Sequence, residues 1–149
     1  MRIFETIKEL TDCGPVEIGS SDWLLIDQAR IDDFARATGD MEWLHVDEER
    51  AQTGPFGGTV AHGFLSLSLI PMLREQIFQI RTPGARLNYG LNRVRFPAPL
   101  PVNSRVRATA RIVELTVAER GLLMNTEYRI DIEGQVKPAC VAETLVLVT

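Results

Sequence analysis

The segment that most constrains the fold is an apolar stretch in the middle of the chain, Ala61–Ile80, which reads AHGFLSLSLIPMLREQIFQI. Its first turns carry no polar side chains apart from two serines, and a helix that is apolar all round is a buried one. Charged residues first appear near its far end, at Arg74 and Glu75. Pro71 should kink this helix, because its ring removes one backbone hydrogen bond and crowds the preceding turn. The segment therefore predicts a central helix enclosed by the rest of the chain.

The residues after this segment alternate between apolar and polar side chains with the period of a half-buried strand. The pattern predicts strands over residues 105–112, 124–133 and 139–148. A fourth strand is expected over residues 91–96, with its register disturbed near Gly90 or Asn92. The side chains expected to face the core are Val106, Ala108, Ala110, Ile112, Met124, Thr126, Tyr128, Ile130 and Ile132. A sheet of such strands curled around one buried helix is an α+β arrangement.

The first sixty residues read mostly as helix and loop. Residues 1–10 are compatible with a short helix. Asp27 is a suitable N-cap for a helix that should stop at Gly39, and Asp47 is a second candidate N-cap for a short helix that ends near Ala51. The glycine-rich segment Thr53–Thr59 must be a loop.

Size and charge exclude several classes of protein. A chain of 149 residues with 45% hydrophobic residues is expected to form one domain, residues 1–149, with a real core. The net charge of −4 argues against a nucleic-acid partner, which would require a basic surface. No apolar stretch approaches the length of a membrane span, and the N-terminus has acidic residues where a signal peptide would be apolar. We therefore expect a cytoplasmic protein that does not bind membranes.

The cysteines and histidines give few candidates for metal binding. Cys13 and Cys140 are too few for a disulfide framework, and no metal-ligand spacing surrounds either residue. They are expected to be free thiols, so neither a metal site nor a cofactor is expected.

The segment ATGDMEWLHVD places Asp40 and His45 five positions apart. A carboxylate next to an imidazole is a common proton-transfer pair, because the pKa of histidine lies near neutrality. The spacing is also explained by structure alone, with Asp40 as a polar loop residue after a helix stop. His62, at the entrance of the central helix, equally suits a packing or capping role.

Gly63 falls in the first turn of the expected central helix. Backbone amides there have no partner within the helix, and the helix dipole makes that end slightly positive. A glycine allows close approach of a ligand oxygen, so an amide in this apolar setting could polarise a carbonyl group. A site that polarises a carbonyl beside an Asp/His pair has the groups needed to add water, or remove it, at the carbons next to that carbonyl.

Together, the segments FARATGDMEWLHVDEERA and GPFGGTVAHGFLSLSL resemble the hydratase-2 motif of the MaoC-like dehydratases, the R-specific enoyl-CoA hydratases. The resemblance covers roughly residues 26–115 and is closest to the short bacterial members with a single hot-dog domain. The chain departs from the family pattern where Trp43 stands in place of a proline. A serine that assists in some members corresponds here to Pro71, so that role is not transferred.

The resemblance implies a hot-dog fold and reversible syn addition of water to a trans-2-enoyl thioester, giving an (R)-3-hydroxyacyl thioester. By position, Asp40 and His45 would be the catalytic dyad, and the amide of Gly63 would bind the thioester oxygen. The substrate carrier would be coenzyme A or acyl carrier protein, and the family's short members are homodimers. Asn88, Tyr89 and Gly90 are equally compatible with lining an acyl tunnel and with simple packing.

Two alternatives remain open from the sequence. A hot-dog thioesterase would place a carboxylate on or beside the central helix, where the chain offers only Glu75, next to Arg74. A module that only binds acyl thioesters would not need a proton-transfer pair.

Overall fold

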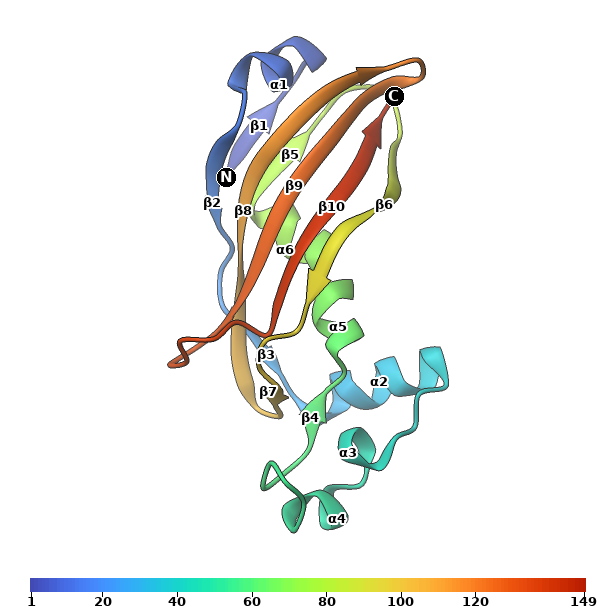
Figure 1. The fold of residues 1–149 in the computed structure, drawn as a ribbon, viewed down its shortest axis with the longest axis vertical. Coiled ribbons are helices and arrows are strands. Elements are labelled where there is room, and N and C mark those ends of the chain that lie inside the picture. Colours follow the sequence, from blue (N-terminus) through green and yellow to red (C-terminus); the bar gives the residue numbers. More distant parts are fainter.

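The computed structural model describes residues 1–149, and its main feature is a long antiparallel sheet curled around two consecutive helices (Figure 1). The sheet has the strand order β2-β8-β9-β10-β6, and β3 pairs with β8 beside β2. Its strands are β2 (Val16–Ser20), β3 (Leu24–Ile26), β6 (Arg86–Arg95), β8 (Ser104–Ala118), β9 (Gly121–Ile132) and β10 (Cys140–Val148). The helices on its concave face are α5 (Gly63–Ser68) and α6 (Ile70–Ile77). This confirms the expected α+β class and is the arrangement of a hot-dog fold.

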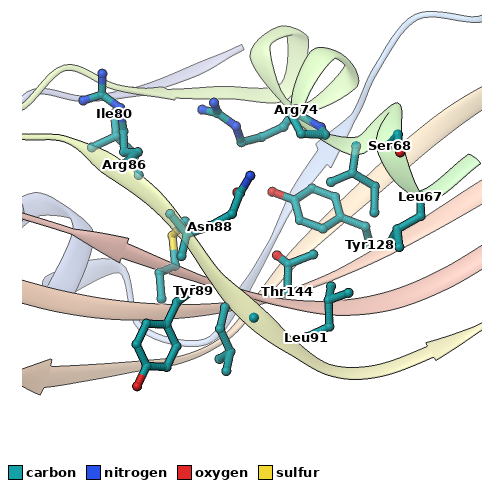
Figure 2. A pocket seen from close by; sticks show the side chains of 16 residues that line it. Leu67, Ser68, Arg74, Ile80, Arg86, Asn88, Tyr89, Leu91, Tyr128 and Thr144 are labelled. Carbon is teal, nitrogen blue, oxygen red and sulfur yellow. The ribbon is translucent and has the colours of Figure 1, made fainter. Parts of the chain in front are cut away.

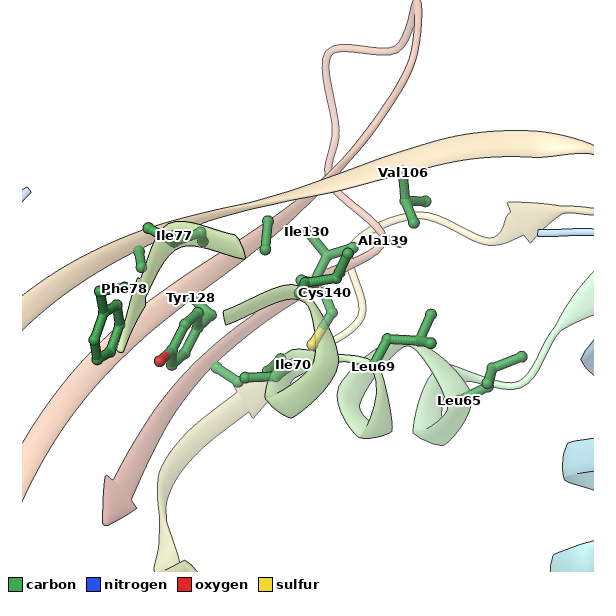
Figure 3. Close-up of a cluster of buried hydrophobic side chains, with 14 of the residues drawn as sticks. Leu65, Leu69, Ile70, Ile77, Phe78, Val106, Tyr128, Ile130, Ala139 and Cys140 are labelled. Atoms are coloured by element: carbon green, nitrogen blue, oxygen red, sulfur yellow. The ribbon is translucent and has the colours of Figure 1, made fainter. Parts of the chain in front are cut away.

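The alternating pattern of the second half correctly identified the core face of the sheet. All nine residues expected to point inward from β8 and β9 are buried. Figure 3 shows Leu69 and Ile70, at the junction of α5 and α6, lying near Cys140 of the sheet in one buried cluster. On the opposite face, Arg107 stands across from Asp131 in the register of β8 and β9. Burial of one face explains why the register is well determined, because a slip of one residue would expose every core side chain.

Strand β6 begins at Arg86, five residues earlier than expected. Its pairing with β10 shifts register around Tyr89 and again around Asn92, close to the predicted disturbance. Strand β6 forms an edge of the sheet, and nearly all of its residues are exposed in the single chain.

The apolar segment forms a shorter helical region than expected. Val60–Ala61 is strand β4, paired with β7 (Leu100–Pro101), and Phe78–Ile80 is strand β5. The helix is interrupted at Leu69, two residues before Pro71. The proline disturbs the turn that precedes it, because it can donate no N–H to that turn and its ring crowds it. The single helix over residues 61–80 was therefore wrong at both ends, because each end forms a long-range strand pair.

The N-terminal segment also differs from expectation. Residues 2–4 form β1 (Arg2–Phe4), which pairs in parallel with β5, and α1 (Ile7–Cys13) begins after the N-cap Thr6. The expected helix over residues 1–10 was therefore wrong in its first half. No helix in the structure is long and apolar enough to cross a membrane.

The capping predictions for the next helices are confirmed. Helix α2 (Gln28–Thr38) starts at Asp27, whose side chain accepts a hydrogen bond from the amide of Arg30, and it ends at Gly39 in the left-handed conformation. Helix α4 (Glu48–Gln52) is capped by Asp47. Between them lies a one-turn helix, α3 (Trp43–Val46), that the sequence pattern did not reveal.

Candidate active site

Three chain segments meet at one end of the sheet, where α2 and α3 lie beside β4, the strand that leads into α5 (Figure 1). The loop after α2 supplies Asp40, helix α3 supplies His45, and the residue before α5 is His62. One carboxylate oxygen of Asp40 and one ring nitrogen of each histidine all lie within 4.8 Å of one another. The two residues of the predicted dyad are thus brought together, with a second histidine beside them.

Asp40 is held in a short turn at the end of α2. Its amide lies 3.4 Å from the hydroxyl of Thr38, and its carboxylate accepts a hydrogen bond of 3.4 Å from the amide of Glu42. Its side chain is 55% exposed in the single chain. The carboxylate therefore keeps acceptor capacity for a water molecule or a substrate.

The orientation of the His45 ring is determined by the chain that leads into α5. Its Nδ1 lies 2.6 Å from the carbonyl oxygen of Val60. A carbonyl oxygen can only accept, so Nδ1 carries the hydrogen and Nε2 of the neutral ring has a free lone pair. The side-chain amide of Gln28 donates a hydrogen bond of 2.8 Å to the backbone carbonyl of His45, and this bond ties α3 to α2. His45 is consequently presented in the tautomer that can accept a proton through Nε2.

His62 lies directly against this pair and is only 2% exposed. Its ring stacks on that of His45, with centroids 3.7 Å apart and planes at 28°. Its Nε2 lies 2.9 Å from the backbone carbonyl oxygen of Asp40 and 4.0 Å from the carboxylate of the same residue. Phe34 covers the ring from another side, at 5.1 Å between centroids. His62 thus contacts both members of the expected dyad.

Gly63 is the first residue of α5, directly after His62. Its amide has no partner within the helix, and no loop carbonyl accepts from it. A Cβ atom at this position would lie 2.9 Å from Cγ of Phe96. A glycine is therefore required because an aromatic ring packs against this backbone, a reason that the sequence alone did not reveal.

The cluster of Asp40, His45 and His62 consists of three residues whose side chains can bind metal ions. A metal ion needs lone pairs that converge on one point. The two rings are stacked, and His45 Nδ1 and His62 Nε2 are already bonded to backbone carbonyls. The geometry suits proton transfer better than coordination of an ion.

A cavity of about 480 Å³ opens beside the end of α5 and along α6. It is bounded on the other side by the strands β6 and β10 (Figure 2). Leu67 and Ser68 line it from the helix, and Asn88, Tyr89 and Gly90 line it from β6. Most of its lining is apolar, as an acyl chain requires. The structure thus places the Asn-Tyr-Gly segment at a cavity rather than in simple packing.

Other groups with possible chemistry are unsuited to catalysis in this fold. Burial raises the pKa of the Cys140 thiol to about 11, so it is not a ready nucleophile. Burial also raises the pKa of Tyr128, although Arg74 opposes this shift. The hydroxyl of Ser68 donates to the carbonyl of Phe64 at 2.7 Å, the backbone bond of a helix-packing serine.

Known proteins resemble this chain over most of its length. The family model described as "MaoC like domain" matches residues 16–132. The chain is 48% identical over 147 residues to 3-hydroxyacyl-thioester dehydratase Z of Mycobacterium tuberculosis, covering 98% of this chain and 97% of the relative. It is 29% identical to the (R)-specific enoyl-CoA hydratase of Rhodospirillum rubrum, covering 91% and 89% of the two chains. The solved structure of the (R)-hydratase from A. caviae involved in PHA biosynthesis superposes with a TM-score of 0.71 at 26% identity, covering 90% of this chain and 98% of that one.

Proposed function

Since the chain belongs to the family of MaoC-like dehydratases, which are hydro-lyases acting on acyl thioesters, we propose that it is an R-specific enoyl-thioester hydratase. In this proposal residues 1–149 form a single hot-dog domain that adds water reversibly to a trans-2-enoyl thioester. The observation that carries the proposal is the meeting of Asp40 and His45 beside the residue that precedes Gly63.

The chemistry follows from the orientation of these groups. The amide of Gly63 donates to the thioester carbonyl, withdraws electron density and makes Cβ electrophilic. Water lies between Asp40 and His45, and Nε2 of His45 takes its proton as the oxygen attacks Cβ. Electrons move onto the carbonyl oxygen, and the dyad then returns a proton to Cα. Because the water oxygen and the proton both arrive from the side of the dyad, the addition is syn. The proposed (R)-3-hydroxyacyl product requires in addition that the matching face of Cβ is turned toward the dyad.

The cavity indicates where the acyl chain of the substrate would bind. We place the acyl chain in the cavity beside the end of α5 and α6, since it is mostly apolar and is lined by Leu67 and Ser68, one turn beyond Gly63 in the same helix. The carrier is coenzyme A or acyl carrier protein. The reaction needs no metal or cofactor, because the dyad and one amide supply both proton transfer and carbonyl polarisation. We place the enzyme in the cytoplasm, where its two free thiols would remain reduced.

The reaction assay separates this function from its two alternatives. With crotonyl-CoA, the wild-type protein is expected to remove the absorbance of the conjugated enoyl thioester without releasing free thiol. An (R)-specific 3-hydroxyacyl-CoA dehydrogenase should oxidise the product, and an (S)-specific one should not. Release of thiol would instead indicate a thioesterase, and binding without either change would indicate a binding module. The structure gives the thioesterase little support, because Glu75 is exposed and paired with Arg74.

We also propose that two copies of the chain form a homodimer through β6. This strand offers a free edge of ten residues with exposed apolar side chains, including Leu87 and Leu91. An uncovered edge of this kind readily pairs with another strand. Antiparallel pairing of β6 with its copy about a twofold axis would close the edge and continue the sheet across both chains.

Light scattering after size exclusion is expected to give twice the mass of one chain. The double variant Leu87→Lys/Leu91→Lys should shift the protein toward the monomer, because two charges at this edge oppose strand pairing. Val136→Lys is the matched control, since Val136 is apolar and exposed in a loop outside the sheet edge. A wild-type monomer, or equal effects of both changes, would contradict the proposed interface.

A further inference from the structure

His62 contacts Asp40 and His45 and directly precedes Gly63, the three residues that act in the proposed reaction. Its ring lies on the ring of His45, its Nε2 is bonded to the backbone carbonyl of Asp40, and its own carbonyl is followed by the amide of Gly63. It makes no side-chain capping bond to α5. The role of an ordinary helix cap, which the sequence allowed, therefore does not account for this histidine.

The hydrogen bond determines the tautomer of His62. The carbonyl oxygen of Asp40 can only accept, so Nε2 carries the hydrogen and Nδ1 of the neutral ring does not. Nδ1 is buried and has no hydrogen-bond partner. A second proton on this ring would create a buried donor without an acceptor, directly against the ring of His45. The ring is thus held in one tautomer as a donor to the Asp40 backbone.

We propose that His62 is a positioning residue for the dyad, an inference that rests on the proposed function. Its Nε2–H holds the loop that carries Asp40, and its ring face sets the plane of His45. Because His62 is joined covalently to Gly63, the same residue sets the distance between the dyad and the amide that polarises the carbonyl.

A purely structural role is the competing explanation. His62 is buried among the rings of Phe34 and His45, so it also contributes to packing. Packing alone needs a ring of this size and does not need a donor at Nε2. The two roles are therefore separated by variants that keep either the ring or the donor.

The experiment compares His62→Phe with His62→Gln in the crotonyl-CoA hydration assay. Phenylalanine keeps a ring but cannot donate to the Asp40 carbonyl, whereas the Nε2 amide of glutamine can still donate. We expect His62→Phe to lower kcat by about ten- to hundredfold with KM changed less than about threefold, since a small misplacement of a catalytic group has effects of this size. His62→Gln is expected to recover a substantial part of kcat. Folded His62→Phe protein with wild-type kcat would overturn the proposal, as would equal losses in both variants.

Hydrogen exchange of the loop gives a readout that does not depend on activity. In His62→Phe, the amides of residues 40–42 should exchange faster than in the wild type, and in His62→Gln they should remain close to it. Nitrogen-15 spectra of the wild-type imidazoles should show the Nε2–H tautomer for His62. If wild-type protein lacked hydratase activity, the proposed function would fail, and these two measurements would still decide whether His62 holds the loop. Unchanged exchange in His62→Phe would refute that role.

Discussion

Replacing Asp40 by Asn or His45 by Gln is expected to lower hydration of crotonyl-CoA by roughly 10²–10⁴-fold, the usual contribution of a general acid–base group. Asparagine keeps the shape of the carboxylate. Its amide is uncharged and far less basic, so it orients and activates the attacking water poorly. Glutamine at position 45 can reach toward Val60 but cannot accept a proton as the Nε2 of His45 does. Both side chains are partly exposed, so the folded state should survive each change.

Glu42→Gln is the matched control for the Asp40 variant. Glu42 is an exposed carboxylate two residues along the same loop, and its side chain makes no capping bond to α3. Its replacement should leave the rate within about twofold, because the contacts of Glu42 with Asp40 and His45 are made by its backbone, which the change keeps. The double variant Asp40→Asn/His45→Gln should be little slower than the worse single variant, since groups that act as a unit are not additive. Near-normal hydration by either single variant would remove the dyad from the mechanism.

Removing the amide hydrogen of Gly63 is expected to reduce kcat by roughly 10²–10³-fold, or about 3–4 kcal/mol, the contribution of one oxyanion donor. Proline is the substitution that removes this hydrogen, and the site tolerates its backbone. Gly63 is the first residue of α5, where proline is favoured, and His62 has the extended conformation (φ −57°, ψ 138°) that a residue before proline adopts. Gly63 is not among the residues with positive φ.

The contact between Gly63 and Phe96 dictates the design of this experiment. Any Cβ at position 63 would meet the Phe96 ring, so Gly63→Pro alone would combine a clash with the loss of the donor. The comparison is therefore Gly63→Pro/Phe96→Ala against Gly63→Ala/Phe96→Ala, which share the added Cβ and the missing ring. Single-turnover hydration should show the full loss only in the proline variant. Equal rates in the two double variants would show that this amide does not polarise the substrate.

Several parts of the fold were predictable because they depend on local chemistry. The caps of α2 at Asp27 and Gly39 follow from a side chain that satisfies a free amide and a residue that adopts the left-handed conformation. The core faces of β8 and β9 follow from strict alternation, since one face of each strand is buried. The resemblance of the segment around Asp40 and His45 to the family motif predicted a pair, and the structure brings both side chains to one place.

The sequence by itself thus determined the class of fold and the buried faces of β8 and β9, because these follow from the local pattern of apolar and polar side chains, and it indicated the candidate dyad through the family resemblance. Only the tertiary structure decided where the apolar segment stops being helical, because Phe78–Ile80 leaves the helix to pair with a strand more than seventy residues earlier. It also decided that His62 lies against His45 and that the Phe96 ring covers Gly63. Such contacts join residues far apart in the chain, and their energy has no signature in the local pattern of apolar and polar side chains.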